Sequence, residues 1–227
     1  MIISKLIMLR NKIKSNKFLR AVAIRCREWR DKRSFTSGKN NQIHCEGIKV
    51  KSRIQIKGNN NKIIIHKNAL LLNSLVRILG DNCVVSVGMD AYLDGVELWI
   101  EDDDNTIKIG DRTFVGHHTH IACTESRKSV SVGSDCMISS HVQLRTGDSH
   151  SILNDKGERI NPAQDVVVSD HCWIGEGSTI LKGTIIERNS IVATKAVVSG
   201  YFGPNVLIGG IPAIIIKKDL DWEKERL

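Results

Sequence analysis

The segment RTGDSHSI, residues 145–152, brings an arginine, a carboxylate and an imidazole close together in the sequence. A histidine imidazole is the side chain best suited to accept a proton at neutral pH, so His150 can serve as a general base that removes a proton from a reacting group. Asp148 would share a face with that ring if the segment is extended, although an aspartate here also suits a turn. Arg145 offers a positive charge to an acidic substrate or a phosphate. The segment therefore predicts a proton-transfer site.

The chain around this segment repeats with a period of six residues. An aliphatic residue recurs at every sixth position from residue 168, and a small residue follows each of the first five after four positions. The two series are Val168, Ile174, Ile180, Ile186, Val192, Val198 and Cys172, Ser178, Thr184, Ser190, Ala196. Six residues make one short strand and one corner, so three units close a triangular coil on which the next coil stacks. The predicted fold is an all-β solenoid.

The same register continues toward the N-terminus, with additional residues at one corner of each coil. The predicted coils are Val132, Ile138, Leu144; Ile109, Val115, Ile121; and Val87, Leu93, Trp99. From Leu144 to Val168 the step is 24 residues, and its six-spaced positions are His150, Lys156 and Pro162 instead of apolar residues. Residues 145–164 are therefore predicted to leave the prism wall as a loop. Loops of this length are usually functional or disordered, which favours a functional His150.

The composition limits the class of protein and its surroundings. Of the 227 residues, 41% are hydrophobic but only 4% aromatic, so the core must consist of Ile, Val and Leu, which suits strands. Six cysteines without CxxC spacing indicate neither a zinc module nor a disulfide framework, and a reducing, cytoplasmic location is expected. No apolar stretch approaches the roughly 20 residues that span a bilayer, and the first residues lack the features of a signal peptide.

Positive charge is concentrated in the first 33 residues. They hold eleven Lys/Arg and two acidic residues, whereas the remainder of the chain is close to balanced, so the net charge of +8 does not indicate nucleic-acid binding. Residues 1–36 are predicted to form a basic helical arm with an apolar stripe. Two interpretations stay open: the arm packs on the main domain or a sister subunit, or residues 1–33 contact anionic lipid at the inner face of a membrane.

Three stretches of the sequence resemble the hexapeptide-repeat acyltransferases. They are the hexads from Val168 to Val198, the phrase DHCWIGEGSTILKGTIIERNSIV and the later GGIPAIIIKK. The stretches SSHVQLRTGDSHSI and RINPAQDVVVSDHCWIG are similar to the branch that O-acetylates sugars and bacterial surface polysaccharides. The resemblance implies a left-handed parallel β-helix, a homotrimer, acetyl-CoA as the co-substrate and no metal. The handedness comes from the resemblance, because a period of six does not set it.

The resemblance also implies roles for individual residues. It makes His150 the catalytic base and places Trp173 beside the coenzyme and its acetyl group. Positions that match the family's pantetheine and phosphate contacts are Gly175, Ser178, Thr194, Ser199, Lys217 and Lys218. Lys195 stands where the family commonly has a glycine, so either the coenzyme contacts differ here or a cation lies beside a phosphate.

Other polar clusters admit a metal interpretation. The cluster GHHTHI contains His117, His118 and His120. Neighbouring residues of a strand point to opposite sides, so these three cannot bind one metal by themselves. We expect His118 and His120 to line the acceptor site with Arg145, and EDDDN at residues 101–105 to form a polar corner and not a calcium site.

The sequence therefore predicts an acetyl-CoA-dependent O-acetyltransferase that acts on a saccharide hydroxyl. The predicted parts are the arm 1–36, the β-helix 37–216 and a C-terminal helix 217–227 that shields the last coil. Within acetyl transfer, a serine or other small-molecule acetyltransferase is the alternative, although a serine acetyltransferase normally has a much longer helical N-terminal domain. Sugar-nucleotide N-acetyltransferases usually have a preceding nucleotide-binding unit, and no glycine-rich fingerprint of such a unit is present in the sequence. A β-helix carbonic anhydrase and a non-catalytic structural solenoid are the alternatives outside acetyl transfer.

Overall fold

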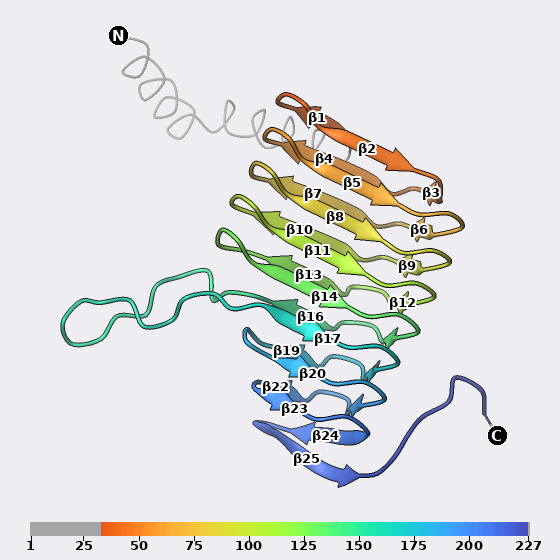
Figure 1. Ribbon diagram of the computed structural model, residues 1–227, viewed down its shortest axis with the longest axis vertical. Coiled ribbons are helices and arrows are strands. Elements are labelled where there is room, and N and C mark those ends of the chain that lie inside the picture. Colours follow the sequence, from red (N-terminus) through yellow and green to blue (C-terminus); the bar gives the residue numbers. More distant parts are fainter. Residues whose placement is uncertain (1–32, 227) are drawn as a thin grey trace, which may run out of the picture. The chain divides into compact units, whose positions relative to one another are not determined.

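The computed structural model describes residues 33–226, which wind into a solenoid of three sheets (Figure 1). Sheet A contains β1 (Phe35–Ser37), β4 (Arg53–Lys57), β7 (Leu75–Leu79), β10 (Glu97–Glu101), β13 (His120–Cys123), β16 (Gln143–Arg145), β19 (Thr179–Ile180) and β22 (Val197–Val198). Sheet B contains β2 (Gln42–Cys45), β5 (Lys62–Ile65), β8 (Val84–Val87), β11 (Thr106–Ile109), β14 (Ser129–Val132), β17 (Val166–Val168), β20 (Ile185–Ile186) and β23 (Tyr201–Phe202). Sheet C contains β3 (Ile48–Val50), β6 (Leu70–Leu72), β9 (Tyr92–Asp94), β12 (Phe114–Val115), β15 (Met137–Ile138), β18 (Trp173–Ile174), β21 (Ile191–Val192), β24 (Val206–Gly210) and β25 (Ala213–Lys218).

Each coil contributes one strand to each sheet, and neighbouring coils pair in parallel register. In sheet A, Leu98 lies beside Ile121 and Ile121 beside Leu144, while Ile180 lies beside Val198 in the later coils. The early coils are longer because additional residues lie at the corner between sheets A and B, here called the A–B corner. This agrees with the prediction that one corner carries the extra length.

The core is the aliphatic interior of the prism. All six aliphatic residues of the predicted hexad series are fully buried, and so are the five small residues. The small residues fit at the corners, where their hydroxyls satisfy corner carbonyls: Thr184 Oγ1 donates to Val198 O at 3.1 Å. Buried polar groups need such partners because an unpaired one is costly.

The corner between sheets B and C, here the B–C corner, has one left-handed residue in each coil from the second onward. These residues are Asn68, Asp90, Arg112, Asp135, His171, Asn189 and Asn205, with φ between 53° and 60°. Asn and Asp tolerate this region better than other residues with a side chain. From Asp90 onward, each such residue donates its backbone N–H to the preceding coil, as His171 does to Ser134 O at 2.8 Å.

Two sequence predictions about individual elements are wrong. Leu98, and not Trp99, occupies the inward position of β10; the Trp99 ring lies outside, with the Arg77 guanidinium 4.8 Å from its centre. In the described part of the predicted C-terminal helix, residues 217–226, no helix forms: residues 213–218 form β25, which pairs antiparallel with β24. Asp219 then adopts φ 56°, a left-handed conformation that a helix cannot continue through.

The predicted basic arm, residues 1–36, lies almost wholly outside the described residues, so that prediction stays a prediction. Residues Thr36–Leu227 make a compact unit of their own. Within residues 33–226, no helix has the length and apolar character needed to cross a bilayer.

Candidate active site

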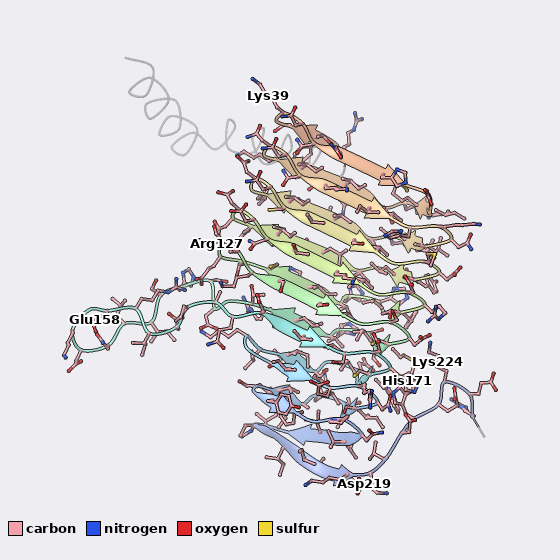
Figure 2. The ribbon with its side chains drawn as sticks, in the orientation of Figure 1. Lys39, Arg127, Glu158, His171, Asp219 and Lys224 are labelled. Carbon is pink, nitrogen blue, oxygen red and sulfur yellow. The ribbon has the colours of Figure 1, made fainter. Side chains whose placement is uncertain are left out.

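The predicted loop is present and leaves the stack at the A–B corner, between β16 and β17 (Figure 1). Its two arms run side by side: Ile160 N donates to Ile152 O at 2.9 Å, and Asn154 N donates to Glu158 O at 2.9 Å. Figure 2 labels Glu158 at the outer end, far from the prism wall. The six-spaced polar positions therefore do form an excursion and not a further coil.

Asn161 ties the two arms together at the neck of the loop. This residue is only 6% exposed. Its Nδ2 donates to His150 O and to Asp148 Oδ2, both at 2.8 Å, and its Oδ1 accepts from Ile152 N at 2.7 Å. One amide side chain thus binds the backbone at residues 150 and 152 and the side chain of Asp148. The imidazole of His150 itself is exposed on the loop, where a substrate could reach it.

Asp148 also stabilises the neck of the loop, through hydrogen bonds that its carboxylate accepts. Lys182, from the next coil, donates its Nζ to Asp148 Oδ2 at 2.5 Å and to Asn161 O at 3.1 Å. The hydrogen bonds of Lys182 and Asn161 lower the pKa of the Asp148 carboxyl. The extended segment assumed for an Asp148–His150 pairing is not found, because Ser149 between them adopts φ 67°. The carboxylate anchors the loop base, and its role toward the imidazole remains a prediction.

Two further charged contacts steady the loop. Arg145 folds over its start, with Nε donating to Gly147 O and Nη2 to Ser149 Oγ, both at 3.1 Å. On the other arm, Arg159 pairs with Glu125, which also accepts from Ala163 N at 3.2 Å. The Arg145 guanidinium is therefore bound to the start of the loop, and its predicted contact with an acidic substrate or a phosphate stays a prediction.

Trp173 begins β18 on the outer face of sheet C, between Met137 and Ile191 of the neighbouring strands. Its side chain is 37% exposed, as expected for a residue that precedes an inward one. Trp222 from the C-terminal segment lies beside it, with ring centres 6.0 Å apart. In Figure 2, His171, two residues before Trp173, lies on the side of the prism opposite to the loop. One chain therefore does not bring His150 and Trp173 together.

The histidine cluster divides between a corner and a sheet. His118 lies at the corner between sheets C and A, here the C–A corner, and stacks on His141 of the next coil with ring centres 5.0 Å apart. His120 begins β13 in sheet A, 3.9 Å from Glu97. Burial lowers the His120 pKa, and Arg145 on the adjacent strand β16 acts in the same direction. His120 and Arg145 thus belong to one sheet, whereas His118 belongs to the corner.

The predicted coenzyme contacts lie on several parts of the coil. Thr194 and Lys195 are exposed at the C–A corner, Ser199 is exposed after β22, and Lys217 and Lys218 end β25. Gly175 is buried where a Cβ would lie 2.6 Å from Thr194 N, so its role is close packing of coils.

The prediction for Ser178 needs correction. Ser178 is fully buried, and its Oγ donates to Gly175 O at 2.8 Å. It belongs to the inward small-residue series, which leaves its side chain no exposed surface for a ligand.

Sequence reasoning missed Asn161, Lys182 and Trp222. Asn161 and Lys182 are polar residues outside the inward series, and Trp222 lies beyond the repeat, so the period of six says nothing about them. Among residues 33–226, no group of three or more His, Cys, Asp or Glu is arranged to hold a metal ion.

Replacing Asn161 with alanine is expected to lower acetyl-transfer kcat about 10- to 100-fold, because small misplacement of a reacting group is costly. The matched control is Asn154→Ala at the far end of the loop, which should retain activity. Steady-state kinetics at neutral pH checks both variants. Neutral pH is chosen because the Asp148 carboxylate is ionised there. Its pKa is lowered in the folded protein, so the stability that it adds to the neck is present above the unfolded-state pKa and is lost only as pH falls through the folded-state pKa. Equal activity of the two variants would exclude a special role for the neck.

A three-sided parallel β-solenoid interrupted by one histidine-bearing loop defines the class of protein. The family model described as the hexapeptide repeat of succinyl-transferase matches residues 165–199. The polysialic acid O-acetyltransferase of Neisseria meningitidis is 32% identical over 149 residues, which are 64% of this chain and 68% of the relative. A protein of Escherichia coli strain K12, named for O-acetyl transfer in lipopolysaccharide biosynthesis, is 32% identical over 61% of this chain and 70% of its own length.

The solved structure of the polysialic acid O-acetyltransferase OatWY is similar throughout the solenoid. It superimposes with a TM-score of 0.81 and 30% identity, covering 85% of this chain and 92% of that chain. The chain belongs to the hexapeptide-repeat acetyltransferases, in the branch of sugar O-acetyltransferases. Its solenoid is accordingly the left-handed parallel β-helix that the resemblance implied.

Proposed function

We propose that this chain transfers the acetyl group of acetyl-CoA to a hydroxyl of a bacterial surface polysaccharide or its precursor. The observation that carries the proposal is the loop at the A–B corner, on which His150 is exposed while Asn161 fixes its carbonyl oxygen. The family assignment and the names of the relatives support a saccharide acceptor.

His150 acts as the general base in this proposal. Its neutral imidazole removes the proton of the acceptor hydroxyl while the oxygen attacks the thioester carbonyl carbon. The tetrahedral intermediate then collapses, the carbon–sulfur bond breaks, and the imidazolium returns the proton to the thiolate of the coenzyme. The products are an O-acetyl ester and the free thiol, so no further reactant is needed.

The residues available for acetyl-CoA fit its chemistry. The indole of Trp173 is exposed on sheet C, and the ammonium groups of Lys217 and Lys218 are exposed on β25, where phosphates could bind. Lys195 lies over Gly177 at the C–A corner and adds a third cation. Arg145, His118 and His120 are left for the acceptor.

We further propose that the chain works as a homotrimer, with each site between two prisms. His150 lies on a loop at the A–B corner, and Trp173 lies beyond the B–C corner, so the two meet only if one subunit supplies the loop and its neighbour supplies the indole. A cytoplasmic location suits the free thiols Cys45, Cys83, Cys123, Cys136 and Cys172.

Subunit mixing tests the shared site. His150→Ala and Trp173→Ala subunits with different tags are refolded or co-expressed together. They are assayed at an acetyl-CoA concentration well below the KM of Trp173→Ala, where each variant alone has little activity. An intersubunit site regains activity in about a quarter of the clefts of a random equal mixture, because a cleft can take both intact residues from different chains. Thiol release from acetyl-CoA with polysialic acid or a lipopolysaccharide saccharide as acceptor, and a mass gain of one acetyl group, measure the reaction.

The outcomes separate the parts of the proposal. Failure of the wild-type protein to acetylate any saccharide, with acetyl-CoA bound, would exclude the acceptor class. Activity in the wild type without recovery in the mixture would place both residues in one subunit's site, contrary to the trimer proposal.

A further inference from the structure

The C-terminal segment, residues 219–226, is called here the strap, because it turns back along the B–C corner of the prism. Leu220 N donates to Asn205 O, and Asn205 Nδ2 donates to Leu220 O, with a donor–acceptor distance of 3.2 Å in both hydrogen bonds. Lys224 Nζ reaches Arg112 O at 3.4 Å, two coils above His171. Figure 2 labels Asp219, His171 and Lys224 along this course. The strap therefore contacts three of the left-handed corner residues, Asn205, His171 and Arg112, which belong to three different coils.

Trp222 is the anchor of the strap. It is only 8% exposed, and its indole stacks on the His171 imidazole with ring centres 4.6 Å apart and planes 11° apart. Trp222 Nε1 donates to His171 O at 2.9 Å, and His171 Nε2 lies 3.0 Å from Trp222 O. Because the other neighbour of Nε2 is an Asp221 carboxylate oxygen at 3.3 Å, this nitrogen carries the proton. Ring stacking and two hydrogen bonds thus hold Trp222 of the strap against His171 of the B–C corner.

The docked indole also touches the candidate coenzyme site. Trp222 lies against Trp173 with ring centres 6.0 Å apart and planes 44° apart, a contact typical of aromatic pairs. Met137 and Ile191 flank Trp173 on the adjacent strands, so the strap covers a further side of the ring. Loss of Trp222 would free the Trp173 side chain to change its orientation.

We propose that Trp222 is a positioning residue, which holds Trp173 in the orientation that receives acetyl-CoA. This inference rests on the proposed function, in which Trp173 borders the coenzyme. It assigns to the strap a role in coenzyme affinity in addition to its packing on the last coils. Trp222 need not touch the coenzyme for this role.

The test compares Trp222→Ala, Trp222→Phe and the matched strap control Lys224→Ala. Trp222→Ala is expected to raise the KM for acetyl-CoA about 3- to 10-fold, in line with the strength of an aromatic pair, and to leave kcat within about two-fold. Trp222→Phe keeps a stacking ring and should restore most of the affinity. Lys224→Ala should match the wild type. Thermal unfolding of each variant is recorded alongside the kinetics.

A double-mutant cycle with Trp173→Ala decides whether Trp222 acts through Trp173. The proposal requires Trp222→Ala to add little to the KM of Trp173→Ala, because coupled residues are not additive. A lowered Tm with an unchanged KM, or equal KM increases in both backgrounds, would overturn it. If Trp222→Ala does not fold, Trp222→Leu, which keeps an apolar side chain but no ring, replaces it in the same cycle, and an unchanged KM or equal KM increases in both backgrounds would overturn the proposal as well. Wild-type protein that binds no acetyl-CoA would instead refute the proposed function itself.

Discussion

The His150→Ala variant is expected to transfer acetyl groups about 10²- to 10⁴-fold more slowly than the wild type, the usual contribution of a positioned general base. Its folding should be unaffected, because the ring is exposed on the loop and the neck contacts of residue 150 use its carbonyl oxygen, which alanine retains. The measurement is kcat with a saccharide acceptor at saturating acetyl-CoA, together with thermal unfolding. A large loss of kcat at unchanged Tm is the expected pair of results.

The matched control is His66→Ala, another exposed histidine, which lies on an early coil. It should change neither rate nor stability. Full acetyl transfer by His150→Ala would show that another group accepts the hydroxyl proton. Loss of both activity and folding in His150→Ala would point to a structural role, which an exposed side chain does not suggest.

The period of six was sufficient to predict most of the inward residues, since a three-sided coil leaves only one geometry in which such a series is buried. It failed at Trp99 because the early coils have longer strands with two inward residues, Leu98 and Ile100 in β10. A period of six residues does not determine which residues of a five-residue strand point into the prism. The prediction of a C-terminal helix was wrong for a different reason. The charged residues of this segment suit a helix, but Leu220 and Trp222 form tertiary hydrogen bonds with Asn205 and His171, and these contacts hold the segment in another conformation.

The candidate site was predictable only in part. The loop and His150 follow from a break in periodicity together with a resemblance, both of which are properties of a local stretch. Asn161, Lys182 and Trp222 act through partners 13, 34 and 51 residues away in the sequence. Such pairs leave no local pattern, so they became visible only with coordinates. Ser178 shows the reverse case: the period of six already placed it inside the prism, and the resemblance alone suggested a ligand contact.

Replacing Ile138 with alanine is expected to lower the free energy of unfolding by about 2–5 kcal/mol, the range for large-to-small changes in a packed core. Ile138 is fully buried in β15, where it stacks between Val115 and Ile174 of the adjacent coils. Denaturant unfolding measures the effect, and an unchanged slope with a lower midpoint would confirm that stability alone has changed.

The position of Ile138 links this stability change to the candidate site. Met137, its neighbour in β15, pairs with Trp173, so a cavity at residue 138 loosens the strand that supports the indole. Ile43→Ala is the matched control, because this isoleucine is 44% exposed and should lose well under about 1 kcal/mol. In a solenoid each coil contacts only its neighbours, so the destabilisation should be centred on the coils around β15. Hydrogen exchange would locate it, and uniform loss of protection from β4 to β24 would contradict this local account.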